Sequence, residues 1–306
     1  MESFNYCKNA VIIIEKIIEA QYVMDDVDIK FLLDSDDNKI YDCSPIKKSS
    51  GFSLLHKCVI LTRKYPKLNN ILRDSFKTKT QFSQSINKTN NEGWTALHLA
   101  TRNSRTTSTE ETVKILLAAG ANVNLQDNEG LAALHIASRN SRIDSTEETV
   151  KILLASGANV NLQDNEGCTA LHLASKYSRN KSTEETVKIL LAAGANVNLQ
   201  DNEGSSALHL ASRYSRTDST EETVKMLLDV GANVNLQINE GWSALQLASG
   251  CSRTDSTEET VKMLLDAGAN VNLQNNVGGW SALHMASRYS RTNSTEETVK
   301  ILLDSG

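Results

Sequence analysis

Most of this chain is one sequence segment repeated in tandem. The first clear copy, residues 93–127, reads GWTALHLATRNSRTTSTEETVKILLAAGANVNLQD. Its first glycine returns every 37 residues and then once after an inserted residue, at Gly93, Gly130, Gly167, Gly204, Gly241 and Gly279. A period of about 20 to 50 residues indicates a solenoid, because each unit has an apolar face that only its neighbours can bury. We therefore expect six units over 93–306, the last one truncated, and a function carried by surfaces.

The sequence of each unit predicts two helices. Thr95 is a suitable N-cap for a first helix that begins with Ala96-Leu97-His98-Leu99-Ala100. In the second helix Val113, Leu116 and Leu117 have the i, i+3, i+4 spacing of a buried stripe. Gly120 stands where a left-handed residue ends a helix, and the turn-rich segment 122–130 follows as a hairpin-like connection.

The second helix carries a recurring start signal, Ser-Thr-Glu-Glu. It predicts a capping box, in which the Ser hydroxyl accepts a backbone N–H three residues on and the Glu reaches back. The predicted pairs are Ser108/Glu111, Ser145/Glu148, Ser182/Glu185, Ser219/Glu222, Ser256/Glu259 and Ser294/Glu297.

The motifs GxTALHLA and VKxLLxxGANVN resemble the ankyrin repeat, over 93–306 without gaps. The resemblance implies an all-α, ankyrin-repeat solenoid of stacked helix-loop-helix units with short β-hairpin connections, and a concave face that grips protein partners. Two departures stand out. The usual proline after Thr is Ala in every clear copy, as at Ala96, and the period exceeds the family's usual value of about 33 residues. The extra residues fall between the helices and predict a longer joint there.

Upstream the pattern decays. Residues 51–92 keep an echo, GFSLLHKC at 51–58, which predicts a diverged repeat. Residues 1–50 contain two helix-like stretches and are interpreted as an irregular helical N-terminal cap that shields the first apolar face. A separate binding module at 1–50 is the alternative.

Composition narrows the classes of partner and compartment. The net charge of −5 argues against nucleic-acid binding through a basic surface and against an acidic membrane surface. Five cysteines without a CxxC pair predict free thiols and no zinc site. We expect a monomer in the cytoplasm, with the nucleus as the alternative compartment.

Nothing in the sequence predicts an enzyme, a cofactor, a metal site or a small-molecule substrate. Five of the six histidines (His98, His135, His172, His209, His284) occupy one repeat position, and His56 is at its diverged equivalent. In the ankyrin family this histidine makes structural hydrogen bonds. Gln246 replaces it once, and an amide can do the same but cannot act as an acid or base.

Two positions vary from copy to copy and are predicted to contact the partner. The residue after the anchor glycine is Trp94, Leu131, Cys168, Ser205, Trp242 or Trp280. The residue before the Asn-Glu-Gly turn is Asp127, Asp164, Asp201, Ile238 or Asn275. Tryptophan is enriched at binding hot spots, but each indole could equally pack on the adjacent hairpin.

The joints predict a second exposed stripe. It has pairs of cations at Arg102/Arg105, Arg139/Arg142, Lys176/Arg179, Arg213/Arg216 and Arg288/Arg291, together with Arg253, Tyr177, Tyr214 and Tyr289. Such a stripe is commonly a solvated surface, and contact with an acidic peptide or nucleic acid is the alternative. Gly250 and the residue inserted before Gly279 predict a soft segment at 241–280.

We expect a non-catalytic scaffold that binds a protein partner along its hairpins and first helices. The long joints and the Asn-, Ile- and Lys-rich start are similar to ankyrin arrays of giant DNA viruses, a resemblance that implies action on host proteins in the host cytoplasm. An adaptor to host ubiquitin ligase machinery and a structural or elastic spacer without a dedicated partner are the alternatives.

Overall fold

A computed structural model describes residues 52–77 and 85–306, so the predicted cap at 1–50 lies outside the described residues. The chain divides into two compact units. One consists of Met1–Ala137 and Asp144–Ala158, the other of Ser138–Ile143 and Asn159–Gly306. Within each unit the described residues form pairs of short helices, which confirms the predicted all-α fold.

In the first unit the described helices pack in two rows. Helix α3 packs on α6, α4 on α7, and α7 on both α6 and α9. Their bounds are α3 Leu54–Ile60, α4 Leu68–Lys77, α6 Ala96–Arg102, α7 Glu110–Ala118 and α9 Glu147–Ala155. Helix α8, Ala133–Asn140, has residues in both units.

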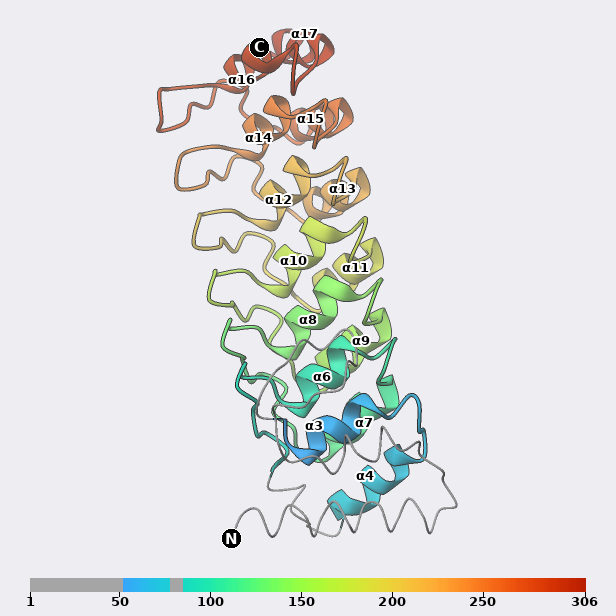
Figure 1. The fold of residues 1–306 in the computed structure, drawn as a ribbon. Helices are drawn as coiled ribbons and strands as arrows, with labels where there is room; N and C mark the ends of the chain where they lie inside the picture. Colours follow the sequence, from blue (N-terminus) through green and yellow to red (C-terminus); the bar gives the residue numbers. More distant parts are fainter. Residues whose placement is uncertain (1–51, 78–84) are drawn as a thin grey trace. The chain divides into compact units, whose positions relative to one another are not determined.

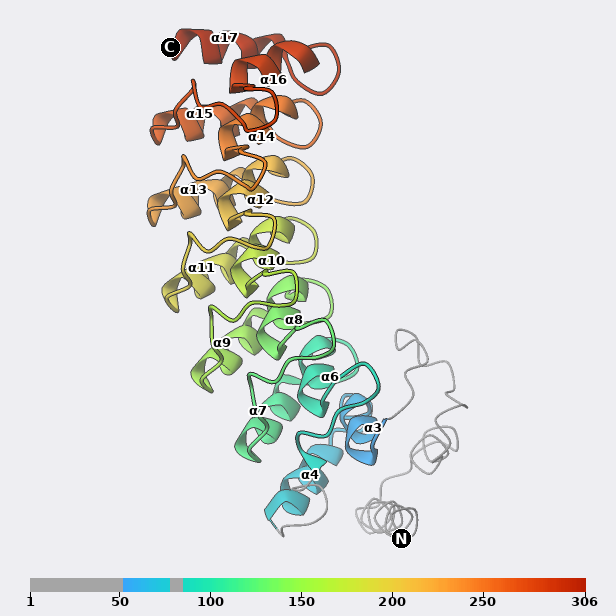
Figure 2. The same ribbon diagram turned by 90° about the vertical axis from the view of Figure 1, so that its left-hand side faces the viewer.

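The second unit repeats one helix pair four times (Figure 1). The first helices form one row and the second helices another, and the hairpins project beyond the first row, toward the viewer in Figure 2. The pairs are α10 Ala170–Tyr177 with α11 Glu184–Ala192, α12 Ala207–Arg213 with α13 Glu221–Asp229, α14 Ala244–Gly250 with α15 Glu258–Asp266, and α16 Ala282–Tyr289 with α17 Glu296–Asp304.

The apolar stripe of the second helix is buried, with one correction. Val113 and Leu116 have no exposed surface, as predicted, but Leu117 is only half-buried. Helix α7 turns Thr112 and Ile115 inward instead, because Thr112 hydrogen-bonds to the neighbouring pair through its hydroxyl, 2.9 Å from Thr62 Oγ1. The buried face is therefore part apolar and part hydroxyl.

The predicted capping boxes of the second helices are wrong by one residue. Thr109, not Ser108, is the N-cap of α7, and its Oγ1 accepts the N–H of Thr112 at 3.2 Å. The same holds for every later second helix, whose caps are Thr146, Thr183, Thr220, Thr257 and Thr295. The serine is fully buried instead and contacts a hydroxyl of the preceding pair, as Ser219 Oγ does with Ser178 Oγ at 3.2 Å.

The buried serines and threonines form a hydroxyl ladder between successive pairs of the second unit. Ser219 Oγ donates to the carbonyl of Ser175 at 2.6 Å, and Thr223 Oγ1 donates to Ser178 Oγ at 2.7 Å. The ladder recurs one repeat later, where Thr260 Oγ1 lies 2.7 Å from Ser215 Oγ. Buried hydroxyls need such partners, so the ladder fixes how one joint sits on the next.

Candidate protein-binding surface

The frame of this surface is the histidine at the start of each first helix. In the second unit His172 Nδ1 accepts the N–H of Thr169 at 3.1 Å, and its Nε2 donates to the carbonyl of Ser205 in the next repeat at 3.0 Å. In the first unit His98 does the same with Thr95 and with the carbonyl of Leu131. The predicted N-cap Thr95 is confirmed.

Gln246 shows that this role is structural. Its Oε1 accepts the N–H of Ser243 at 2.7 Å, and its Nε2 donates to the carbonyl of Trp280 at 2.6 Å. An amide thus reproduces both bonds of the histidine. The predicted structural role of the histidines is confirmed.

Burial keeps the histidines His56, His98, His172 and His209 neutral at neutral pH. It lowers the pKa of His209 to about 4, against the opposing effect of the hydrogen bond to the carbonyl of Leu236. It lowers the pKa of His56 to about 4 in the same way, and it also lowers the pKa of His98 and His172. A neutral ring can accept at Nδ1 while it donates at Nε2, which is the arrangement that the frame requires.

The residue before each Asn-Glu-Gly turn holds its hairpin in shape. Asp201 Oδ1 accepts the N–H groups of Glu203 and Ser205 at 3.0 and 2.7 Å. Asp127 and Asp164 make the equivalent bonds, and Asn275 Oδ1 accepts the N–H of Trp280 across the longer turn. Ile238 has no side-chain acceptor and keeps only main-chain bonds, from its N–H to the carbonyl of Trp242 and from the N–H of Gly241 to its own carbonyl. The connections are therefore turns, and among the described residues the one isolated β-bridge joins Gln237 to Ser243.

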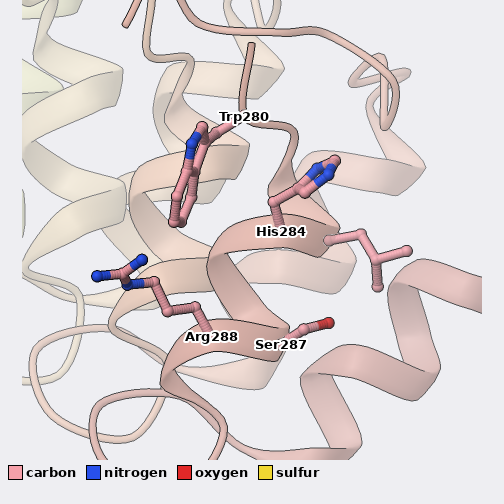
Figure 3. Close-up of a pocket in the computed structure, with 5 residues that line it drawn as sticks. Trp280, His284, Ser287 and Arg288 are labelled. Carbon is pink, nitrogen blue, oxygen red and sulfur yellow. The ribbon is translucent and has the colours of Figure 1, made fainter. Parts of the chain in front are cut away.

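Two tryptophans after the anchor glycine lie along their own first helices. In the first unit the Trp94 ring is 6.4 Å from the ring of His98 and 5.2 Å from Arg102 Cζ. In the second unit Trp280 is 6.3 Å from His284 and 5.0 Å from Arg288 Cζ (Figure 3). A depression of about 390 Å³ lies there, lined by Trp280, Leu283, His284, Ser287 and Arg288.

Trp242 has no such cation, because Gly250 stands where Arg288 stands in the next repeat. Its Nε1 donates to Glu240 Oε2 at 3.1 Å, and its side chain is half-buried. All three indoles are thus packed on one side and exposed on another. This geometry is compatible with both predicted roles of the tryptophans, packing and contact.

The other residues at this variable position are less accessible. Cys168 and Ser205 are buried, at 8% and 7% exposure, while Leu131 is half-buried. Burial raises the pKa of the Cys168 thiol to about 12, with Asp164 as the next cause. Burial likewise raises the pKa of Cys58 to about 12 and that of Cys251. These thiols remain protonated at neutral pH.

The joint cations separate into two kinds that the sequence does not distinguish. The second member of four pairs, Arg105, Arg142, Arg179 or Arg216, joins successive repeats, as where Arg179 Nε donates to the carbonyl of Ser219 and Arg216 Nε to that of Ser256, both at 2.9 Å. The first member lies on an aromatic ring, as Arg213 does over Tyr214. Lys181 also lies over Tyr177, at 5.0 Å, and the repeat pattern gave no signal for it because other repeats have Thr, Asp or Asn there.

Within the part of the chain that the structure describes, no helix is long and apolar enough to cross a membrane. Residues 52–77 and 85–306 also contain no group of three or more His, Cys, Asp or Glu side chains that could hold a metal ion.

Comparison with known proteins agrees with this architecture. A family model described as ankyrin repeats, in three copies, matches residues 69–148, 145–238, 177–275 and 218–306. No curated protein matches the chain. A similar solved structure is the ankyrin repeat domain of Bcl-3, described as a unique member of the IkappaB protein family. It is 27% identical, with a TM-score of 0.65 over 83% of this chain and 99% of that one.

The motifs, the histidine frame and the helix pairs thus coincide with the family match over 69–306, well over half of the 306 residues. The chain belongs to the ankyrin-repeat family.

Proposed function

We propose that this chain is a non-catalytic scaffold that binds a protein partner through its hairpins and first helices. The proposal rests chiefly on one observation. At the variable position the repeats are stacked through the main-chain carbonyls of Trp94, Leu131 and Trp280, so their side chains are left to make other contacts, and the half-buried side chain of Trp242 holds the same position. Half-buried tryptophans on a rigid frame are suited to anchor a partner.

Asp164, Asp201 and Ile238 are half-buried on the neighbouring hairpins and complete the proposed contact surface. Action as a monomer in the cytoplasm, an origin in a giant DNA virus and delivery of a partner to host ubiquitin ligases stay predictions from the sequence. The resemblance of the fold to the ankyrin repeat domain of Bcl-3 supports the general role of a binding module.

The ankyrin arrays that the sequence resembles belong to giant DNA viruses of amoebae, so affinity capture from an amoeba lysate tests the proposal. The wild-type chain should retain a defined protein, and W242A/W280A should lose it while keeping its helical circular dichroism. V230A is a matched control, because Val230 is a solvent-exposed apolar residue (51% exposed) next to the second helix α13. Retention of no protein by the wild type would favour the spacer, and unfolding of W242A/W280A would assign the indoles to packing.

A further inference from the structure

The second unit carries a continuous row of cations and tyrosine rings at the ends of its first helices. Arg139 Cζ lies 5.4 Å from the centre of the Tyr177 ring. Lys176 Nζ lies 5.3 Å from Tyr177 and 5.6 Å from Tyr214. Arg213 Cζ lies 5.3 Å from Tyr214. We call Arg139, Tyr177, Lys176, Tyr214 and Arg213 the cation–tyrosine row.

The row crosses repeats because Lys176 contacts the tyrosine of its own repeat and also that of the next. It has definite ends. Asn140 takes the tyrosine position beside Arg139, and Gly250 and Cys251 take both positions after Tyr214. The row is therefore a local feature of three successive repeats and not a property of every repeat.

These cations have no carboxylate partner in the described part of the chain. Neither the three cations of the row nor Lys181, which adds to it over Tyr177, forms an ion pair within 4.0 Å there. Arg213 is exposed and the others are half-buried, so all can be reached. On a chain with a net charge of −5, four neighbouring cations held on aromatic faces form a local anion-binding surface.

We propose that the cation–tyrosine row binds an extended acidic segment of the protein partner, with a carboxylate against each cation. Packed helices lie about 8 to 10 Å apart, so the cations on successive first helices follow one another at about that spacing. Three residues of extended chain, at about 3.3 Å each, cover the same distance. A segment with Asp or Glu at every third residue thus matches the row. This inference rests on the proposed function and gives its partner a chemical class.

A peptide fits better than a single-stranded nucleic acid. Nucleic-acid binding needs open ring faces for base stacking, and three cations, Arg139, Lys176 and Lys181, already surround the ring of Tyr177. The carboxylates of Asp164 and Asp201 share their surroundings with Lys176 of the row. The charges of all three residues influence the pKa of the Cys168 thiol. They would repel a continuous phosphate chain more than a peptide with spaced carboxylates.

Fluorescence anisotropy with the full chain tests this proposal. The probes are a labelled peptide that repeats Glu-Ser-Gly, the same peptide with Gln for Glu, and a single-stranded DNA of mixed sequence. The wild type should bind the Glu peptide saturably and the Gln peptide far more weakly. K176Q/R213Q should weaken binding of the Glu peptide by about tenfold with unchanged circular dichroism.

The matched control is K188Q/K225Q, which removes the same charge from exposed positions on α11 and α13. Binding should stay within about twofold of wild type, because Lys188 and Lys225 lie on second helices and are not part of the cation–tyrosine row. Equal weakening in both variants, tighter binding of DNA, or no saturable binding of the Glu peptide would overturn the proposal. Tryptophan-dependent capture would then still support the scaffold, whereas a wild type that captures nothing would remove the scaffold as well.

Discussion

Residues 167–240 of the second unit contain two helix pairs, and residues 241–279 build a third pair of the same kind from different side chains. At the histidine position, His209 and Gln246 both accept the N–H of their N-cap residue and donate to a main-chain carbonyl of the following turn region. On the surface, by contrast, Gly250 and Cys251 replace the cation and the tyrosine that end the row. Stacking tolerates any side chain with the right donor and acceptor, whereas surface chemistry changes completely between neighbours.

The largest expected effect concerns a feature that both segments share, the anchor glycine. Gly204 has φ 82°, and an added Cβ would lie 2.7 Å from Asn239 N in the next hairpin. We expect G204A to lower the free energy of unfolding by about 3 kcal/mol or more, because backbone strain and a collision with backbone combine. Urea denaturation measures this.

Gly194 provides the control within the same unit. It has φ 85° but its added Cβ would meet nothing within 4 Å. G194A should therefore cost only about 1 to 2 kcal/mol, the strain of a left-handed residue. If G204A cost no more than G194A, close approach of the hairpins would not be what holds the repeats together.

The next prediction concerns the pH dependence of stability, in which histidine and glutamine should differ at this position. Burial lowers the pKa of His209 to about 4 from 6.5, so below pH 6.5 the unfolded chain binds more protons than the folded one. Stability conferred by the neutral ring is present above pH 6.5 and is lost as the pH falls toward 4. From pH 7 to pH 5 this loss is about 2 kcal/mol for one such histidine.

H209Q should therefore lose about 2 kcal/mol less than the wild type over that pH range, while staying within about 1 kcal/mol of it at pH 7. Urea denaturation at both pH values gives the comparison. Gln246 is the precedent within the chain for the substitution. An unchanged acid dependence would mean that His209 is not the neutral, buried group described above.

The smallest effect concerns the predicted soft segment, 241–280. Gly250 is the last residue of α14, and an added Cβ would make one close contact, 2.9 Å from the flexible end of Met285 at Cε, and an ordinary contact with Met285 Cβ at 3.8 Å. G250A should raise the free energy of unfolding by about 0.5 to 1 kcal/mol, because alanine is the better helix former and Met285 can move. Amide hydrogen exchange should be faster in 241–280 than in 167–240, and slower in G250A; equal protection in the wild type would contradict the prediction.

The features that could be predicted from the sequence are local. Thr95 and His98 are three residues apart, and the buried Val113 and Leu116 follow helical spacing, so pattern alone finds them. The cap of the second helix is different. Ser108 and Thr109 both carry a hydroxyl that could cap the helix. The hydroxyl of Ser108 instead hydrogen-bonds to that of Thr62, 46 residues earlier. A capping rule that considers only neighbouring residues cannot include so distant a partner, so it places the cap one residue too early.

The surface shows the same limit. Lys176 and Arg179 are two cations of the same joint, and the sequence gives no reason to assign them different roles. In the structure Arg179 joins two repeats, whereas Lys176 contacts two tyrosine rings. Only the stacking of one repeat on the next separates them. Differences between the copies mark the variable position after the anchor glycine, but the burial of Cys168 and Ser205 depends on how the folded repeats pack.

The main-chain acceptors of the histidine frame have a further consequence. Four of the carbonyls that receive these bonds belong to the variable position, those of Trp94, Leu131, Ser205 and Trp280, which are residues of three different types. A carbonyl is the same whatever side chain it carries. Assembly and recognition therefore depend on different atoms of one residue, and repeats with new side chains at this position could be exchanged or reordered without redesigning the joints between them.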